Sequence, residues 1–396
     1  MTGSTITTAT APKKSRGRLW LVVHGWLALP LWVLLFVVCV TGTLLTVAHE
    51  LEWLATPTVR ASNPDGLPRL PLNDVVAKVA EAYPHAIITR VEHLAPYMAL
   101  DVGVALPDAP FARVHVNPYT GAVQGMTEGP GFHGFLFGLH SWLLFPWEGA
   151  MNYGWYIVTS LGFFMIGSIV TGLVVYKKFW KAFTQPRLRL NKGARTFWGD
   201  LHRLVGVWSL WFSATIAVTG AWFLVILVIY ASGYEVFPHA PQLAREGVPP
   251  PRPGAERVMP DLDRAVEAAE AALPGFRLHQ ISLPDSAYSH VTLWGSQGFS
   301  FFGDHGSQVF VDPYTGAVGS TRTPADMNAL QVSARLLPSL HFGAFGGLVT
   351  KIIWFVFGLG LSAMVLSGIV IWIKRTAKAT TETLRPAASP APAAAE

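Results

Sequence analysis

The chain has 396 residues, of which 51% are hydrophobic and only 13% charged, and its formal net charge at pH 7 is +5. A soluble protein carries about 25% charged residues, so a large part of this chain is expected to lie in a lipid bilayer. Its single cysteine, Cys39, excludes an internal disulfide bond and a cysteine-ligated iron–sulfur cluster. The basic residues flank the apolar runs, so the positive charge does not indicate a nucleic-acid partner.

Four apolar runs are long enough to cross a membrane, because a spanning helix needs about 20 apolar residues. A short basic arm precedes the first run, which extends from about Leu19 to Ala48 and is too long for the core of a signal peptide. The other runs cover about Tyr153–Tyr176, Phe197–Tyr230 and Leu348–Ile373. We therefore predict an integral membrane α-helical bundle of four transmembrane helices.

Two polar segments, one after the first run and one after the third, each have the pattern of a small α+β module. In the first, Asn73–Tyr83 has helical periodicity with a polar N-cap, and Asn117–Gly121 has the composition of a turn. The second segment has a helix at Leu262–Ala272 and a turn at Asp312–Gly316. The predicted strands are residues 87–91, 98–104, 111–116, 277–283 and 290–294.

The chain repeats itself. The octapeptide Val116–Val123 reappears, with Asn changed to Asp, as Val311–Val318. A histidine also stands at the start of each half, followed after 17 and 18 residues by a Thr-Gly pair, and a Leu-His pair comes shortly before the second apolar run of each half. We interpret the chain as a duplication of one unit, in which an outer domain lies between two His-bearing spans. The matched histidines are His24 and His202, and His140 and His341.

The predicted parts follow from these elements. They are a disordered cytoplasmic arm (1–17), the first span (18–50), the first module (52–130), an interfacial helix with the second span (131–180), a cytoplasmic loop (181–196), the third span (197–230), the second module (231–335), the fourth span (336–376) and a disordered tail (377–396).

The orientation follows from the distribution of Lys and Arg. Basic clusters flank the N-terminus, the loop between the second and third spans, and the C-terminus. Cytoplasmic loops of membrane proteins carry an excess of basic residues, so these three parts are expected in the cytoplasm. Both modules then face outward, into the periplasm if the protein lies in the inner membrane of a Gram-negative cell.

The four matched histidines are candidate metal ligands. Both halves begin on the same side of the membrane, so a pseudo-twofold axis along the membrane normal should relate them. His24 and His202 would then share one depth near the cytoplasmic face, and His140 and His341 another near the outer face. A metal on the axis could take one ligand from each half, and haem suits two trans imidazoles. A single histidine at a helix end is more often a polar anchor, and a proton relay or a small-metal site stays open, although zinc needs three or four ligands.

Two further histidines, His49 and His133, have no counterpart in the other half. They are reserve ligands or residues on the substrate side. The remaining seven lie in the modules and are expected at the surface: His85, His93, His115, His239, His279, His290 and His305.

The sequence lacks the motifs of several classes of enzyme. The sequence has no dinucleotide-binding glycine fingerprint and no phosphate-binding Walker motif, and its cytoplasmic parts are too short for a nicotinamide or flavin domain. If the protein moves electrons, they must come from a membrane quinol or from a separate reductase. Neither an ATP-driven pump nor a hydrolase is indicated.

The Leu-His openings, the Thr-Gly pairs and the duplicated Pro-Tyr-Thr-Gly modules resemble the PepSY-associated transmembrane family of bacterial inner-membrane proteins. The resemblance covers about residues 18–378 and implies that the modules are PepSY-like. It also implies two non-covalent b-type haems held by His24, His202, His140 and His341, and reduction of a ferric siderophore in the periplasm. The sequence departs from the family pattern after His140 and His24, where Ser141-Trp142 and Gly25-Trp26 stand in place of an arginine.

The sequence leaves two rival functions open. PepSY-like modules also occur as inhibitory or peptide-binding units, so the protein could regulate a partner without redox chemistry. It could also transport a metal or a siderophore, which would require polar residues at mid-membrane depth.

Overall fold

The computed structural model describes residues 16–28, 31–149, 151–244, 246, 248, 259–299 and 301–383. The Pro-rich linker at 249–253, most of the predicted arm and the end of the predicted tail lie outside the described residues. The chain forms two compact units. The first comprises Met1–Val37, Leu161–Val218 and Gly360–Glu396, and the second comprises Val38–Ser160 and Thr219–Leu359.

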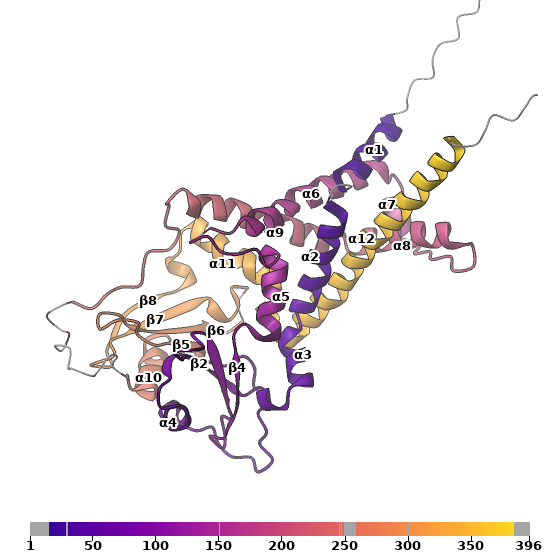
Figure 1. Cartoon of the computed structure of the whole chain (residues 1–396). Helices are drawn as coiled ribbons and strands as arrows, with labels where there is room; N and C mark the ends of the chain where they lie inside the picture. The colour runs from indigo at the N-terminus through magenta and orange to yellow at the C-terminus, as the bar shows by residue number, and fades with distance from the viewer. Residues whose placement is uncertain are drawn as a thin grey trace, which may run out of the picture. The chain divides into compact units, whose positions relative to one another are not determined.

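Within the described ranges, three helices are long and apolar enough to cross a membrane. They are α6 (Tyr153–Val175), α9 (Leu210–Ala231) and the stretch Ala344–Thr376, which contains most of α12 (Gly347–Thr383) (Figure 1). Helices α1 (Arg16–Ala28) and α2 (Trp32–Leu45) qualify only together, as a pair bent by 62°. The described chain therefore has three candidate spans, or four if the bent pair counts as one.

Two of the predicted spans are interrupted. The first, residues 18–50, breaks between α1 and α2, which are bent by 62° relative to each other. The third, residues 197–230, divides into α8 (Ala194–Trp208) and α9 at Ser209, whose hydroxyl donates to the Val205 carbonyl over 2.6 Å. An apolar run indicates membrane depth but does not require one straight helix.

Three of the four candidate ligand histidines lie on helices that come directly before a candidate span, and the fourth, His24, lies on the first helix of the bent pair. His24 lies on α1 and His202 on α8, while His140 lies on α5 (Gly131–Trp142) and His341 on α11 (Ala329–Phe342). The remaining short helices are α3 (Ala48–Ala55), α7 (Phe179–Thr184) and the 3-10 turns Pro57–Val59, Gly303–His305, Pro324–Asp326 and Ala344–Gly346. Contrary to prediction, α12 continues to Thr383, into the segment expected to be disordered.

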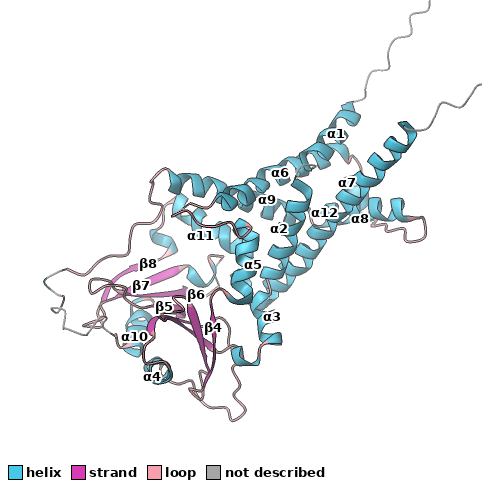
Figure 2. Ribbon diagram, in the orientation of Figure 1, coloured by secondary structure: helices cyan, strands magenta, loops and turns pink. Residues whose placement is uncertain are grey.

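The second unit contains one antiparallel sheet of eight strands in the order β4-β3-β2-β1-β5-β6-β7-β8 (Figure 2). The two predicted modules thus share a single sheet, joined where Val91 of β1 pairs with Ile281 of β5. This pairing covers a strand edge that each four-stranded half would otherwise expose. The strands are β1 (Ile87–Glu92), β2 (Leu100–Ala105), β3 (Ala112–Val116), β4 (Val123–Glu128), β5 (Phe276–Ser282), β6 (Val291–Gln297), β7 (Ser307–Val311) and β8 (Val318–Arg322).

The sheet has one apolar face and one polar face. Helices α4 (Leu72–Ala82) and α10 (Leu262–Ala272), both expected from the sequence, cover the apolar face (Figure 2). Side chains such as Val102 on β2 and Val114 on β3 are fully buried there. Because side chains alternate along a strand, their neighbours Asp101 and His115 point to the opposite face. Both predicted turns are present, and Gly121 and Gly316 adopt the left-handed φ values of 71° and 73° that glycine tolerates.

Helices α4 and α10 cap each other. Asp263 accepts hydrogen bonds from the backbone N–H groups of Leu72 (2.7 Å) and Asn73 (3.1 Å) at the start of α4. Asn73 in return accepts from the N–H of Leu262 over 2.9 Å. The prediction that Asn73 caps its own helix is therefore wrong, since the N-cap of α4 is Pro71 and the Asn73 side chain serves α10 instead.

We expect Asp263→Ala to destabilise the sheet unit, because it leaves two N–H groups of the α4 first turn without their acceptor. The loss of such a cap costs about 1 kcal/mol, which corresponds to a fall in melting temperature of about 2–4 °C for a unit of this size. Thermal unfolding of the detergent-solubilised full chain measures this fall in melting temperature. The control is Asp65→Ala, which replaces an exposed aspartate. Equal melting temperatures of the two variants would contradict the capping role.

Candidate functional site

The structure brings His24 and His202 together in the first unit. Their ring centres lie 6.4 Å apart and the ring planes make an angle of 75°. Both side chains are half-buried. The matched intervals in the sequence predicted that these two residues would face each other, although they are 178 positions apart.

A hydroxyl or a carbonyl fixes the orientation of each ring of this couple. Nδ1 of His24 lies 2.9 Å from the Thr171 hydroxyl, which itself donates to the Gly167 carbonyl over 2.7 Å. The Thr171 oxygen is then left to accept from Nδ1–H. Nδ1 of His202 lies 3.1 Å from the Met364 carbonyl and 3.0 Å from the Ser367 hydroxyl. A carbonyl can only accept, so Nδ1 of His202 carries the proton.

The second couple, His140 and His341, lies in the second unit. The ring centres are 6.2 Å apart and the planes make an angle of 47°. Nδ1 of His140 donates to the Val38 carbonyl over 2.9 Å, and Nδ1 of His341 lies 2.7 Å from the Thr219 hydroxyl. Phe223 packs edge-to-face on the His341 ring, with ring centres 5.1 Å apart.

All four rings therefore use Nδ1 for a protein contact. Within the described part of the chain, no hydrogen-bond partner lies on Nε2 of any of them. A neutral imidazole whose Nδ1–H is taken presents a lone pair on Nε2, and metal-binding histidines are oriented in this way. Each couple thus offers two Nε2 ligand atoms. Among the described residues, there is no group of three or more His, Cys, Asp or Glu side chains that could hold a metal ion.

Glycines lie against three of the four rings. A Cβ atom at Gly172 would lie 3.5 Å from Cε1 of His24, and one at Gly368 would lie 3.5 Å from Cε1 of His202. A Cβ atom at Gly42 would lie only 2.5 Å from Cε1 of His140. Sequence reasoning recognised Gly42 within its Thr-Gly pair but missed Thr171-Gly172 and Ser367-Gly368. The signal was present, because a hydroxyl residue followed by glycine stands near the end of both the second and the fourth apolar run.

The reserve histidines form a pair of their own. His49 on α3 and His133 on α5 stack with ring centres 4.3 Å apart and planes 12° from parallel. The lone pair of an imidazole nitrogen lies in the ring plane, so the lone pairs of two stacked rings lie in nearly parallel planes and do not converge on one ion. Nδ1 of His49 is buried and has no hydrogen-bond partner among the described residues. Burial lowers the pKa of His133, and nearby Arg113 lowers it further, so His133 is neutral at pH 7.

An ion pair lies next to the stacked histidines. Glu50 of α3 accepts from Lys351 of α12 over 2.9 Å and from the Tyr97 hydroxyl over 3.0 Å. Burial acts to raise the pKa of Glu50, but the hydrogen bond and charge of Lys351 and the bond from Tyr97 outweigh it, so the pKa is lowered. Glu50 is therefore ionised at neutral pH, and Lys351, which lies within a candidate span, has a charged partner.

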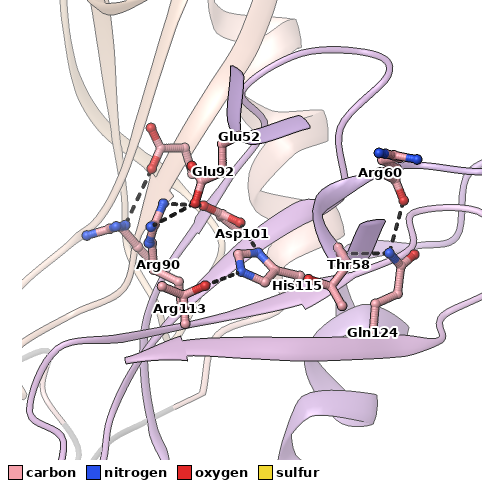
Figure 3. Close-up of polar contacts among 10 residues, drawn as sticks. Glu52, Thr58, Arg60, Arg90, Glu92, Asp101, Arg113, His115 and Gln124 are labelled. Carbon is pink, nitrogen blue, oxygen red and sulfur yellow. Dashed lines mark hydrogen bonds and ion pairs between the residues drawn. The ribbon is translucent and has the colours of Figure 1, made fainter. Parts of the chain in front are cut away.

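The polar face of the sheet holds a buried network (Figure 3). Asp101 accepts from Nδ1 of His115 over 2.6 Å, and Nε2 of that ring lies 2.8 Å from the Thr127 hydroxyl. Arg113 donates to the same carboxylate over 3.2 Å and lies 3.8 Å from Glu52. His115 is 1% exposed, so the prediction that it lies at the surface is wrong. Both of its nitrogens are engaged, which is the pattern of a structural network rather than of an open site.

The burial of His115 has a simple cause. It stands between two core valines on β3, and strand alternation places it on the face opposite to theirs. There Thr127 of β4 contacts its ring, and Glu52 of α3 lies beside the neighbouring Arg113. His290 is also buried, at 8% exposure, and donates through Nδ1 to the Pro241 carbonyl.

Comparisons with known proteins agree with the membrane architecture. A family model described as PepSY-associated TM region matches residues 21–375, which include all four histidines of the two couples. An uncharacterized protein of Pseudomonas aeruginosa is 30% identical over 156 residues, which are 37% of this chain and 37% of that protein. The matched stretch thus spans little more than a third of that relative.

Proposed function

Since this chain belongs to the family of proteins with a PepSY-associated transmembrane region, we propose that it is a haem-containing electron-transfer protein of the inner membrane that reduces ferric siderophores or other ferric chelates in the periplasm. The observation that carries this proposal is the geometry of the two histidine couples. The descriptions of the matched family and of the relative mention no cofactor and no substrate. The haem, the electron acceptor and the reductase activity are therefore our proposal.

Both couples fit haem in the spacing of their rings. Imidazole nitrogens bind metals at about 2.0 Å, so two imidazole rings whose centres lie about 6 Å apart could share one metal ion. The observed separations are 6.4 Å and 6.2 Å. His24 and His202 would hold one haem and His140 and His341 the other, each through Nε2. When bound, haem supplies one-electron redox chemistry.

The chain's own residues prepare these ligands. Thr171, Ser367 and two backbone carbonyls keep the proton on Nδ1 of His24, His202 and His140 and orient these rings. The Thr219 hydroxyl holds the His341 ring in one orientation. A fixed orientation reduces the rearrangement that a change of iron charge would cause. The half-buried, apolar surroundings limit access of water to the ligand atoms, which tunes the redox potential.

The proposal also includes a topology. The bent pair α1–α2 counts as one of four spans, both termini lie in the cytoplasm and the sheet faces the periplasm. Two matched hydroxyl–glycine pairs beside His24 and His202 and the symmetric strand order of the sheet support an internal duplication. A membrane quinol or a separate reductase would supply electrons from the cytoplasmic side.

The acceptor follows from coordination chemistry. Siderophores hold Fe(III) through hard oxygen ligands and bind Fe(II) far more weakly, so one electron releases the iron. Phe132 and Trp147, which are 44% and 46% exposed, lie on or just after the helix that carries His140 and could contact such a chelate. We propose this surface as the acceptor's docking site.

Anaerobic reoxidation kinetics test the function. The purified full chain, reduced with dithionite and freed of excess reductant, is mixed with a ferric siderophore and an Fe(II)-specific chromogenic chelator. We expect oxidation of the haem and formation of the Fe(II) complex in equal amounts. Haem that stays reduced in the presence of every ferric chelate tried would contradict the proposed reductase activity while leaving haem binding intact.

We expect Gly42→Ala to lower the content of the haem held by His140. The added methyl group would lie 2.5 Å from Cε1 and 2.9 Å from Nδ1 of His140, so the ring must move away from the Val38 carbonyl. Gly172→Ala is a matched control, because its methyl group would make only an ordinary 3.5 Å contact with His24. Haem quantified per chain should fall towards one in the first variant and stay unchanged in the second. Equal haem content in both would refute the role assigned to Gly42.

A further inference from the structure

A basic cleft of about 350 Å³ lies in the first unit, between the end of α6 and the start of α9. Its volume lies in the range of about 300–1,000 Å³ that small-molecule sites have, so it is larger than a single ion needs. Its lining includes five basic side chains and one carboxylate. The charged residues are Lys178, Lys181, Arg187, Arg189, Arg203 and Asp200.

Both oxygens of the carboxylate already accept hydrogen bonds from arginine side chains. Asp200, only 4% exposed, accepts two hydrogen bonds from the Arg189 guanidinium, at 2.8 Å and 2.9 Å, and a further one from Arg203. This arrangement fixes both arginines at the wall of the cleft. Among the described residues, Lys178, Lys181 and Arg187 have no acidic partner. The cleft therefore keeps an excess of positive charge that an anionic ligand could neutralise.

The cleft lies at a membrane boundary. Helix α6 is a candidate span of 23 residues that ends at Val175, directly before the first lining residue, Tyr176. The segment that forms the cleft then leads through α8 into the next candidate span, α9. Helices α7 and α8 pack against each other, and Phe183 stacks on Trp208 with ring centres 5.0 Å apart.

Exposed apolar side chains accompany the positive charge. Trp180 is 75% exposed and Leu190 68% exposed, and each is close in sequence to a basic residue of the cleft. A soluble anion gives no reason for such residues, whereas an amphiphile needs both an apolar contact and a cation. Tryptophan at the ends of spans is typical of the headgroup level of a bilayer.

We propose that this cleft binds the phosphate headgroup of an anionic phospholipid, with Lys178, Lys181 and Arg187 contacting phosphate oxygens and Trp180 lying at the acyl boundary. Basic pockets beside membrane spans bind anionic lipid headgroups in this way. The site depends only on the membrane-spanning character of the chain and not on haem or on reductase activity.

Native mass spectrometry of the full-length protein, titrated with phosphatidylglycerol in detergent micelles, tests the proposal. The variant Lys181→Gln/Arg187→Gln should bind the first lipid at least about tenfold more weakly than the unaltered chain, because each basic residue near anionic lipid is worth about a fivefold change in affinity. The matched control Lys374→Gln/Arg375→Gln removes the same charge from the exposed end of α12 and should change binding less than about twofold. Phosphatidylcholine should not bind tightly, and Arg187→Lys should retain binding.

Three outcomes would overturn the proposal. Equal losses in the two double variants would mean diffuse attraction rather than a site. Displacement of the lipid by millimolar inorganic phosphate would identify a soluble anion as the ligand. A fall in haem content with unchanged lipid binding would mean that the basic residues serve a haem propionate instead.

Discussion

His202→Ala is expected to lower the haem content of the purified chain from two per chain to one. The substitution removes one of the two Nε2 atoms that we propose as haem ligands in the first couple, and a b-type haem has no covalent link that would retain it. The remaining haem should keep the low-spin spectrum of an iron with two imidazole ligands. His341→Ala should remove the other haem, and the double variant should contain none.

The control for these variants is His239→Ala. His239 is exposed and pairs with Glu235 of its own loop, so its loss should leave both haems in place. Haem is quantified after extraction as its pyridine complex and divided by protein concentration. If His202→Ala retained both haems with unchanged spectra, the assignment of His24 and His202 as an axial couple would be wrong.

Asp101→Ala is expected to cause the largest loss of stability in the sheet unit. Asp101 is 3% exposed and accepts hydrogen bonds from both His115 and Arg113, so its removal takes this acceptor from a half-buried guanidinium and a buried imidazole. Breaking a buried charged pair in this way costs about 3–5 kcal/mol, or a fall in melting temperature of roughly 6–20 °C.

Thermal unfolding of the full chain beside Asp108→Ala, which removes an exposed carboxylate from the loop after the same strand, isolates the effect of burial. The control should unfold within about 1 °C of the unaltered chain. A similar small shift in both variants would show that Arg113 and His115 find other partners and that the network contributes little.

The couples were predictable from the sequence because the repeat encodes them. His24 and His202 precede their Thr-Gly pairs by equal intervals, and His140 and His341 each follow a leucine before an apolar run. In the proposed duplication, equivalent positions of the two copies lie at equivalent depth, so the pairing can be predicted without any knowledge of contacts. The same logic could have identified Thr171 and Ser367, whose hydroxyls lie beside these rings.

Other parts of the site depend on non-local contacts that no spacing reveals. His49 and His133 stack although 84 positions separate them and neither is repeated. Asn73 has the composition of an ordinary N-cap, yet it serves a helix that begins 189 positions later. Three strands, β4, β7 and β8, were missed. The strands β4 and β8 are largely polar, so their apolar alternation is weak, and β7 has an apolar run of only three residues, Val309–Val311. The polar side chain of His115 indicated a surface position, but the contacts that other residues make on the polar face of the sheet bury it.

The most direct test of the central claim is the oxidised-minus-reduced absorption spectrum of the purified, unaltered chain, combined with haem quantification and electron paramagnetic resonance. The account predicts two b-type haems per chain, both low-spin with two imidazole ligands. A colourless protein, or haem with a single imidazole ligand, would contradict it.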